Sequence, residues 1–218
     1  MRSHGPSLAD VAREMGVRDE RLLEAIREVP RAAFVPHGLV DLADEDVPVP
    51  IGHAQVTTQP TLVASMVEAL CLRGSEVVLE VGSGYGYQTA LLARLSRYVW
   101  GVERWPDLAA TAEQNLRALG ITNATIVVGD GTEGLAAHAP FDAVVVCAAF
   151  PRVPVPLVDQ LVVGGRLVQP IGPAGADQVT SFVKAQSGRL EEVEVLTPAR
   201  FVPLLGAHGY PIDETHGP

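Results

Sequence analysis

The sequence predicts an α/β protein with a doubly wound, mostly parallel sheet. Short apolar runs alternate with stretches of helical spacing from residue 77 to residue 171, a pattern typical of parallel strands covered on both faces. Two further strands flank a turn at Ser187-Gly188, so they are expected to pair antiparallel. The prediction is therefore a seven-stranded sheet with antiparallel last strands, preceded by a helical extension.

The individual elements follow from the apolar spacing and the breaker residues. Two short helices are expected between Ser7 and Val29, with Ser7 or Asp10 capping the first and Asp19 the second. The proline-rich stretch from Phe34 to Pro60 is expected to be irregular. Helices are predicted at 59–71, 88–96, 106–119 and 156–162. Strands are predicted at 77–81, 98–102, 125–128, 141–147, 165–171, 179–185 and 190–196.

The bulk composition indicates a folded chain and narrows its partners. The 218 residues are 47% hydrophobic and 19% charged, which is enough apolar material for a sizeable core. A net charge of -10 and a single lysine, Lys184, disfavour a nucleic-acid partner. The N-terminus from Met1 to Asp10 lacks the apolar core of a signal peptide, and no apolar run is long enough for a membrane span. Cys71 and Cys147 are expected to be buried free thiols, which fits a cytoplasmic location.

A glycine-rich turn, Gly82-Ser83-Gly84-Tyr85-Gly86, follows the first predicted strand of the sheet. Ligands of open α/β sheets bind at the carboxyl ends of the strands, and glycine allows the backbone to turn tightly there. The spacing G-x-G-x-G differs from the G-x-G-x-x-G of dinucleotide binders, which makes a nicotinamide dehydrogenase a poor interpretation. The turn favours a ligand without a pyrophosphate, such as an adenosyl amino acid.

Three acidic residues lie at or near the ends of neighbouring predicted strands. Glu103 is placed to accept hydrogen bonds from both ribose hydroxyls, and Asp130 from an adenine amino group. Glu80 lies inside the strand before the glycine turn, where a buried acid needs a partner such as the ammonium of the ligand. Together with the turn, these acids predict a site for an adenosyl cofactor.

With these residues in place, the chain resembles the protein-L-isoaspartate O-methyltransferase family from about Leu8 to Gly206. The glycine motif is shared by many methyltransferases, whereas the segment Ile51 to Pro60 and the final Phe201-Val202-Pro203-Leu204 are specific to this family. Further matching segments are Val29-Pro30-Arg31, Phe34-Val35-Pro36, Val78-Leu79-Glu80-Val81-Gly82-Ser83-Gly84-Tyr85-Gly86-Tyr87-Gln88-Thr89-Ala90, Val102-Glu103-Arg104, Gly129-Asp130-Gly131, Phe141-Asp142-Ala143 and Ala148-Ala149-Phe150-Pro151.

The resemblance implies a Rossmann-like methyltransferase fold and a repair reaction. The family transfers a methyl group from S-adenosyl-L-methionine to the free α-carboxylate of an isoaspartyl residue and releases S-adenosyl-L-homocysteine. The ester then closes to a succinimide, which reopens partly to aspartate. Because a carboxylate is already ionised at pH 7, no general base is required. Alignment of the methyl donor with the acceptor carboxylate supplies the catalysis. Neutral hydrogen-bond donors can hold this carboxylate without quenching its nucleophilicity.

The resemblance also assigns residues to the site. Thr58 stands where the family carries its active-site serine, although it is also a candidate for the cap of the following helix. The helix N-terminus and Thr57 are expected to add donors for the acceptor carboxylate. The predicted cofactor residues are Glu80, Gly82, Ser83, Gly84, Gly86, Gln88, Glu103, Arg104, Asp130 and Gly131. The predicted substrate residues are Gln55, Thr57, Thr58, Ala148, Val202 and Leu204, of which the last two are expected to pair with an extended peptide.

The chain departs from the family at three positions near the acceptor. The family usually has glycine at Ala54, threonine at Val56 and serine at Thr58, and Ala54 matters if its backbone needs a positive φ. Two other functions therefore stay open: methylation of a normal aspartate in a dedicated peptide, and cofactor binding without catalysis. His53 is interpreted as a loop histidine, and Asp46 has no forced role.

The expected organisation has three parts. Residues 1–60 form the helical extension and a substrate-covering segment, residues 61–205 the methyltransferase domain, and residues 206–218 an irregular tail that is expected to fray. The expected partners are isoaspartyl proteins or peptides, with neither nucleic acid nor membrane. The protein is expected to act as a cytoplasmic monomer without a metal.

Overall fold

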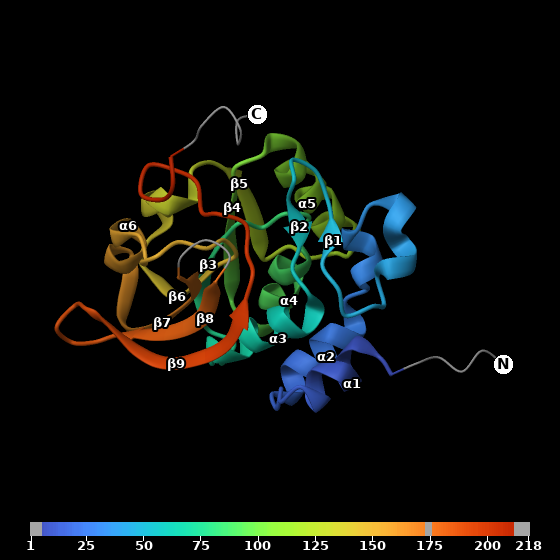
Figure 1. Ribbon diagram of the computed structural model, residues 1–218, viewed down its shortest axis with the longest axis horizontal. Coiled ribbons are helices and arrows are strands. Elements are labelled where there is room, and N and C mark those ends of the chain that lie inside the picture. Colours follow the sequence, from blue (N-terminus) through green and yellow to red (C-terminus); the bar gives the residue numbers. More distant parts are fainter. Residues whose placement is uncertain (1–5, 173–175, 212–218) are drawn as a thin grey trace.

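A computed structural model describes residues 6–172 and 176–211 and contains a seven-stranded sheet in the order β5-β4-β3-β6-β7-β8-β9 (Figure 1). The pairs from β5 to β7 are parallel, and β8 runs antiparallel to both β7 and β9. The predicted fold class is confirmed, with β8 as the one reversed strand of this sheet. The strands are β3 (Val77–Val81), β4 (Tyr98–Glu103), β5 (Ala124–Val128), β6 (Phe141–Val146), β7 (Leu161–Ile171), β8 (Asp177–Lys184) and β9 (Leu190–Ala199).

The register of the central strands brings their carboxyl ends to one edge of the sheet. Val81 pairs with Val102 of β4 on one side and with Val146 of β6 on the other. The chain leaves β3 toward β4 and β5 and returns past β3 to β6, so the strand order reverses between β3 and β6. This reversal is the switch point at which open α/β sheets bind their ligands.

Helices cover both faces of the sheet. Alternate residues of β3 divide between two apolar clusters, with Val78 facing one and Leu79 the other. The first cluster packs against α3 (Pro60–Ala69), α4 (Tyr87–Leu95) and α5 (Pro106–Ala118), the second against α6 (Val155–Asp159). The first cluster also includes buried residues of α1 (Leu8–Glu14) and α2 (Glu20–Glu28). The N-terminal helices thus share a core with the sheet, and the division at residue 60 stays a prediction.

Two segments differ from the predicted secondary structure. The proline-rich stretch contains the short 3-10 helices η1 (Arg31–Phe34) and η2 (His37–Leu42), and a hairpin of β1 (Val49–Pro50) and β2 (Val56–Thr57). These elements were missed because they are too short for periodicity to register. Strand β7 begins at Leu161 rather than near 165. A bulge and the positive φ of Gly164 (81°) allow the strand to start before the Gly164-Gly165 pair.

The part of the tail that the structure describes is ordered, so the expectation of fraying is wrong for residues 206–211. The backbone N–H of Ala207 donates to the Asp130 carboxylate at 2.7 Å, and that of His208 to the Thr132 hydroxyl at 3.0 Å. The Tyr210 ring contacts Phe150 edge-on. Residues 212–218 lie outside the described part of the chain.

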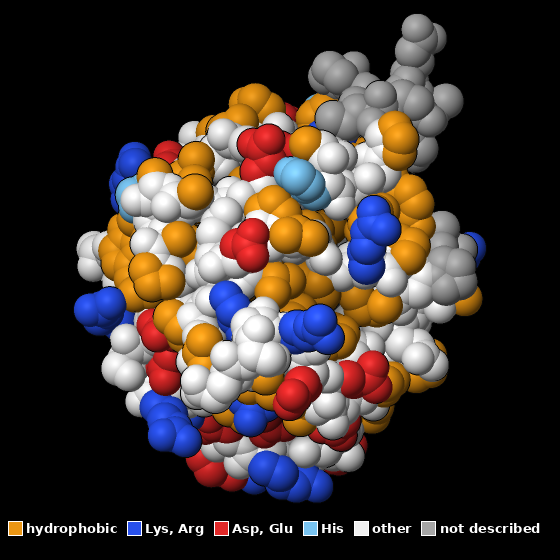
Figure 2. All heavy atoms as spheres, turned by 90° about the vertical axis from the view of Figure 1, so that its left-hand side faces the viewer, with side chains coloured by type: hydrophobic (Ala, Val, Ile, Leu, Met, Phe, Trp, Pro, Cys, Tyr) orange, Lys and Arg blue, Asp and Glu red, His pale blue; other side chains and the backbone are white. Residues whose placement is uncertain are grey.

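The surface carries mixed charge, and both cysteines differ from their prediction, since Cys147 is only partly buried. Basic and acidic side chains are interspersed over the face that carries α6 and the turn between β8 and β9 (Figure 2). Among the described residues, no helix is both long and apolar enough to cross a membrane. Cys71, predicted to be buried, is exposed and adopts a positive φ of 51° just after α3, where the chain reverses direction.

Candidate active site

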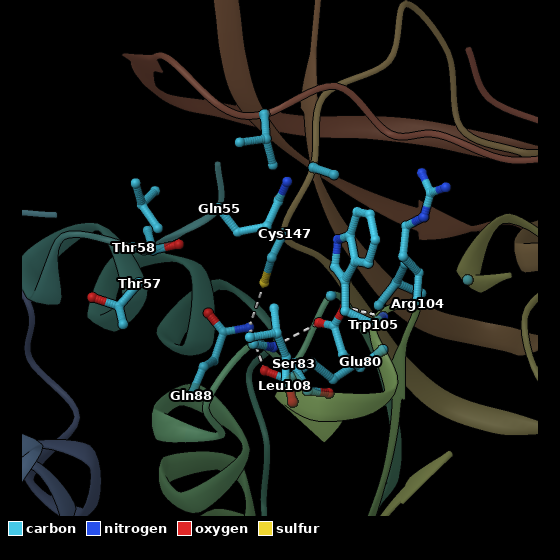
Figure 3. Close-up of a pocket in the computed structure, with 18 of the residues that line it drawn as sticks. Gln55, Thr57, Thr58, Glu80, Ser83, Gln88, Arg104, Trp105, Leu108 and Cys147 are labelled. Atoms are coloured by element: carbon cyan, nitrogen blue, oxygen red, sulfur yellow. Dashed lines mark hydrogen bonds between the residues drawn. The ribbon is translucent and has the colours of Figure 1, made fainter. Parts of the chain in front are cut away.

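A cleft lies at the carboxyl ends of β3 and β4, with about 970 Å³ of free space including its open mouth. Figure 3 shows side chains from the glycine turn, the β1–β2 hairpin and the end of β4 converging on it. The predicted site residues that line the cleft are Gln55, Thr57, Thr58, Glu80, Gly82, Ser83, Gly84, Gln88, Glu103, Arg104, Gly131, Ala148, Val202 and Leu204. Gly86 and Asp130 do not line it.

The glycine turn has the backbone conformation that its sequence predicts. Gly82, Gly84 and Gly86 all have positive φ, at 86°, 55° and 92°. The N–H of Gly82 donates to Val102 of β4, which ties the start of the turn to the sheet. Gly86 is the N-cap of α4, and a Cβ there would lie 3.3 Å from Ala112 of α5. Gly86 therefore shapes the turn from behind rather than facing the ligand.

Glu103 lies at the end of β4 with its carboxylate fixed by the backbone. One oxygen accepts a hydrogen bond from the N–H of Gly84 at 2.8 Å and the other from that of Trp105 at 3.0 Å. Burial raises the pKa of Glu103, and these backbone donors oppose the rise. The carboxylate retains lone pairs toward the cleft, so it is preorganised to accept from a pair of ligand hydroxyls.

Glu80 is completely buried inside β3 and meets the polar side chains of α4. Its oxygens accept hydrogen bonds from the Gln88 amide at 3.1 Å and from the Thr89 hydroxyl. Burial raises the pKa of Glu80 to about 7. The Gln88 amide also donates to the sulfur of Cys147, a cleft residue that the sequence analysis had not assigned to the site. A cationic group in the cleft would stabilise the ionised form of Glu80.

Three polar atoms of the cleft fit a polar ligand. The hydroxyl of Ser83, the amide oxygen of Gln88 and one terminal nitrogen of Arg104 are buried and make no hydrogen bond within the described residues. Buried polar atoms without a partner are rare in folded proteins because desolvation costs free energy. Two acceptor carboxylates together with these groups suit the hydroxyls, ammonium and carboxylate of an adenosyl amino acid.

Asp130 is engaged by protein groups in this structure. Its oxygens accept from the N–H and hydroxyl of Thr132, at 2.9 and 2.7 Å, and from the N–H of Ala207. A Cβ at Gly206 would overlap the Asp130 carboxylate, so the tail passes directly against it. The adenine assignment of Asp130 stays a prediction, while the adjacent Gly131 faces the cleft.

The β1–β2 hairpin places two hydroxyls at the other end of the cleft. The Thr57 hydroxyl accepts hydrogen bonds from Arg31 at 2.9 Å and from the Val49 N–H at 3.3 Å. The Thr58 hydroxyl makes no hydrogen bond to any described residue, although Thr58 lines the same cleft. The hairpin thus offers one oriented and one free hydroxyl to a ligand.

Asp46 takes the helix-capping role that had been considered for Thr58. The N-cap residue of α3 is Gln59, and its side chain makes no capping hydrogen bond. The Asp46 carboxylate instead accepts from the Thr61 N–H at 2.9 Å, the Thr61 hydroxyl at 2.8 Å and the Gln59 amide at 2.7 Å. The interpretation of Thr58 as a cap is wrong. At the N-terminus of α3 the Thr61 N–H is already bonded to Asp46, and the contribution of this helix end to anion binding stays a prediction.

His53 and Ala54 form the tip of the hairpin. Both have positive φ, 55° and 54°, and the Gln55 N–H donates to the Gly52 carbonyl across the turn. The His53 ring stacks on Trp105 at 3.9 Å, and its Nε2 lies 2.9 Å from the Asp107 carboxylate. His53 is therefore a loop histidine that anchors the hairpin to α5, and not a cleft residue. Its ring partner Trp105 and the neighbouring Ile51 and Leu108, which the sequence analysis missed, line the cleft.

The segment after β9 closes the cleft from the side of β6. Ala149 exchanges backbone hydrogen bonds with Val202 and Leu204, both at 2.8 Å, and Pro203 has no N–H to donate. These bonds use groups that the predicted pairing with a peptide would need. The Leu204 carbonyl also accepts from the Tyr210 N–H, whereas the Val202 N–H makes no hydrogen bond within the described residues. The peptide contacts of Val202 and Leu204 stay a prediction.

A seven-stranded, doubly wound sheet with acids at its strand ends around a glycine turn defines an S-adenosylmethionine-dependent methyltransferase. The sequence model of "Protein-L-isoaspartate(D-aspartate) O-methyltransferase (PCMT)" matches residues 5–209. The chain belongs to this family.

Individual relatives agree over most of their length. The chain is 49% identical to the protein-L-isoaspartate O-methyltransferase of Methanoculleus marisnigri, covering 91% of this chain and 89% of that one. It is 52% identical to the enzyme of the same name from Anaeromyxobacter dehalogenans, covering 90% and 95%. A solved structure from Plasmodium falciparum in this family, in complex with S-adenosyl-L-homocysteine, superposes with a TM-score of 0.76 at 25% identity, covering 92% and 99%.

Proposed function

We propose that this protein transfers the methyl group of S-adenosyl-L-methionine to the free α-carboxylate of L-isoaspartyl residues in damaged proteins. The carrying observation is that the hydroxyls of Thr57 and Thr58 line the same cleft as the buried acids Glu80 and Glu103. Membership of the family supports the same reaction. The two ends of the cleft thus suit a cationic methyl donor and an anionic methyl acceptor.

The cofactor end is built to bind a cation-bearing nucleoside. Glu103 would hold the ribose hydroxyls of the cofactor, and Glu80 would hold its ammonium, directly or through Gln88. When bound, the cofactor supplies an electrophilic methyl group on a sulfonium centre. The protein keeps both acids pinned by hydrogen bonds, so they need little reorganisation when the cofactor arrives.

The acceptor end binds an anion with neutral donors. An ionised carboxylate can attack the methyl group in line without losing a proton, so the chain needs no general base. Thr58 donates its hydroxyl to the acceptor carboxylate and is the proposed catalytic residue. Hydroxyl donors hold an anion while leaving electron density on its oxygens, whereas a direct Lys or Arg contact would lower the nucleophilicity. Alignment of the two bound groups supplies the remaining rate enhancement.

The test is methyl transfer from labelled S-adenosyl-L-methionine to a matched pair of peptides that differ only in an isoaspartyl or aspartyl linkage. We expect a base-labile methyl ester on the isoaspartyl peptide and a rate at least about 100-fold lower on the aspartyl peptide, a difference of about 3 kcal/mol in transition-state binding. Equal rates would instead indicate a dedicated aspartyl substrate. Cofactor binding without any ester on either peptide would contradict the enzyme assignment.

We further infer that the protein acts as a cytoplasmic monomer on protein or peptide substrates, and not on nucleic acid or at a membrane. The net charge of -10 supports a substrate other than nucleic acid, and the free thiols of Cys71 and Cys147 suit a reducing compartment. Sedimentation of the purified protein tests the monomer, and fractionation of the source cells tests the location.

A further inference from the structure

Arg31 is a buried cation that no carboxylate neutralises directly. The residue is 3% exposed, and within the described part of the chain no acidic oxygen lies within ion-pair distance of its guanidinium. Its terminal nitrogens donate instead to backbone carbonyls of Leu42, Ala43, Glu45 and Val47, at 2.7 to 3.4 Å. A buried charge of this kind is costly unless a compensating negative charge is close.

The remaining hydrogen bond of Arg31 reaches the active site. One terminal nitrogen donates to the Thr57 hydroxyl at 2.9 Å, and Thr57 lines the cleft while Arg31 does not. The Val49 N–H donates to the same oxygen at 3.3 Å. A threonine hydroxyl has two lone pairs and one proton, so both lone pairs are occupied. Toward a ligand, the Thr57 hydroxyl can act only as a donor.

We propose that Arg31 is a positioning residue for the methyl acceptor: through the Thr57 hydroxyl, it directs a polarised O–H and a positive potential at the substrate carboxylate. This inference rests on the proposed function. A hydrogen bond from a cation strengthens the O–H that lies beyond it in the chain. The arrangement favours an anion over a neutral amide, because the positive potential of Arg31 attracts a charged acceptor more strongly than an amide oxygen that accepts from the same Thr57 hydroxyl.

The separation between charge and acceptor explains how binding and nucleophilicity can coexist. A guanidinium in direct contact would hold the carboxylate tightly and oppose its attack on the methyl group. With one hydroxyl between them, the cation contributes electrostatic attraction and the substrate oxygen keeps its electron density. The other charged groups that bear on Arg31 are Asp44 and Asp46, and Tyr87 packs nearby; Asp46 is committed to the N-terminus of α3.

The experiment compares the binding of two peptides to the protein saturated with S-adenosyl-L-homocysteine, so that no turnover occurs. One peptide carries an isoaspartyl residue, and the other carries the matched isoasparaginyl residue, whose α-carboxamide is neutral. The variants are Arg31→Met and Thr57→Val, with Arg31→Lys and Thr57→Ser as conservative controls. Affinity for S-adenosyl-L-homocysteine and the thermal midpoint of each variant report whether the fold and the cofactor end are intact.

We expect Arg31→Met to weaken isoaspartyl binding about tenfold, as for loss of one charge-assisted hydrogen bond, and to weaken isoasparaginyl binding much less. Thr57→Val is expected to do the same, the double variant to add little, and Thr57→Ser to retain the discrimination. Equal losses on both peptides would overturn the proposal, because they would mean that Arg31 only holds the loop. If Arg31→Met does not fold, the discrimination by Thr57→Val decides.

The outcome for the wild-type protein separates this proposal from the proposed function. A wild-type protein that methylates the isoaspartyl peptide but binds both peptides equally retains the function and overturns the role of Arg31. A wild-type protein that binds S-adenosyl-L-homocysteine yet methylates neither linkage contradicts the proposed function itself.

Discussion

The two ends of the cleft are held in place by different kinds of interaction. The cofactor end lies on strands β3 and β4, where backbone pairing fixes Glu80 against Gly101 of β4 and Glu103 against Val128 of β5. The acceptor end lies on a hairpin of two short strands. The side chains of Arg31 and His53 hold this hairpin, and Asp46, just before it, bonds to Thr61, just after it. The first is rigid through its sheet, and the second depends on a few distant side chains.

This difference implies that single substitutions act differently on the two ends. A change in Glu80 should alter electrostatics and leave the backbone in place, because the ladder of β3 and β4 carries the geometry. A change at the hairpin should alter position as well as chemistry. The following predictions test that contrast, in order of decreasing effect.

The largest expected effect is on stability as a function of pH in the Glu80→Gln variant. The pKa of Glu80 in the fold is about 7, above its ordinary 4.5, so its favourable contribution is present below pH 4.5 and is lost as the pH rises through 7. The loss amounts to about 3 kcal/mol. Glu80→Gln should flatten this decrease while weakening cofactor binding. Denaturant unfolding of the cofactor-free protein from pH 5 to pH 8 measures it, and an unchanged pH dependence would contradict the assignment.

Glu103→Ala should weaken binding of S-adenosyl-L-homocysteine by roughly 1–3 kcal/mol, the free energy of lost charged hydrogen bonds. The carboxylate also orders the Gly84 and Trp105 backbone, so Glu103→Gln serves as the control that keeps an acceptor oxygen. Isothermal titration measures the affinity, and the KM for the acceptor peptide should change little at saturating cofactor. An unaltered cofactor affinity would mean that the ribose assignment is wrong.

Thr58→Val should reduce kcat/KM for the isoaspartyl peptide by about tenfold, as for loss of one hydrogen bond to an anion. The side chain makes no bond to the described residues, so the fold and the cofactor affinity should be unaffected. Thr58→Ser restores the hydroxyl and should regain most of the activity. Steady-state kinetics measures both variants, and full activity of Thr58→Val would remove the residue from the catalytic role.

The smallest expected effect is at the hairpin tip. Ala54 has a φ of 54°, a conformation that costs a residue with a Cβ about 1 kcal/mol. Ala54→Gly should relieve this strain, which by itself would raise the free energy of unfolding by about 1 kcal/mol. The greater conformational entropy of glycine in the unfolded chain offsets part of this gain, so we expect a net increase of a few tenths of a kcal/mol. Thermal unfolding measures the change. A decrease in stability would show that the constraint on the unfolded chain outweighs the strain in the turn.

The two ends of the cleft also differ in how far they could be predicted from the sequence. Strand β3 was predicted with its observed bounds because a short β-branched run followed by glycines is a strong local signal. The hairpin was not predicted, because its strands are two residues each and its turn carries His53-Ala54 in place of the usual Asn-Gly. Ala54 does have a positive φ, so the condition under which its difference from the family matters is met.

The sequence by itself determined the fold class, the cofactor class and the strand-end acids, because hydrophobic period, glycine spacing and strand ends are local properties. The tertiary structure decided the use of Arg31, Asp46 and Asp130. Each of these side chains makes its decisive contact 15 or more residues away, with Thr57, Thr61 and Ala207. Such contacts depend on how packed elements meet, which no local pattern of a single chain records.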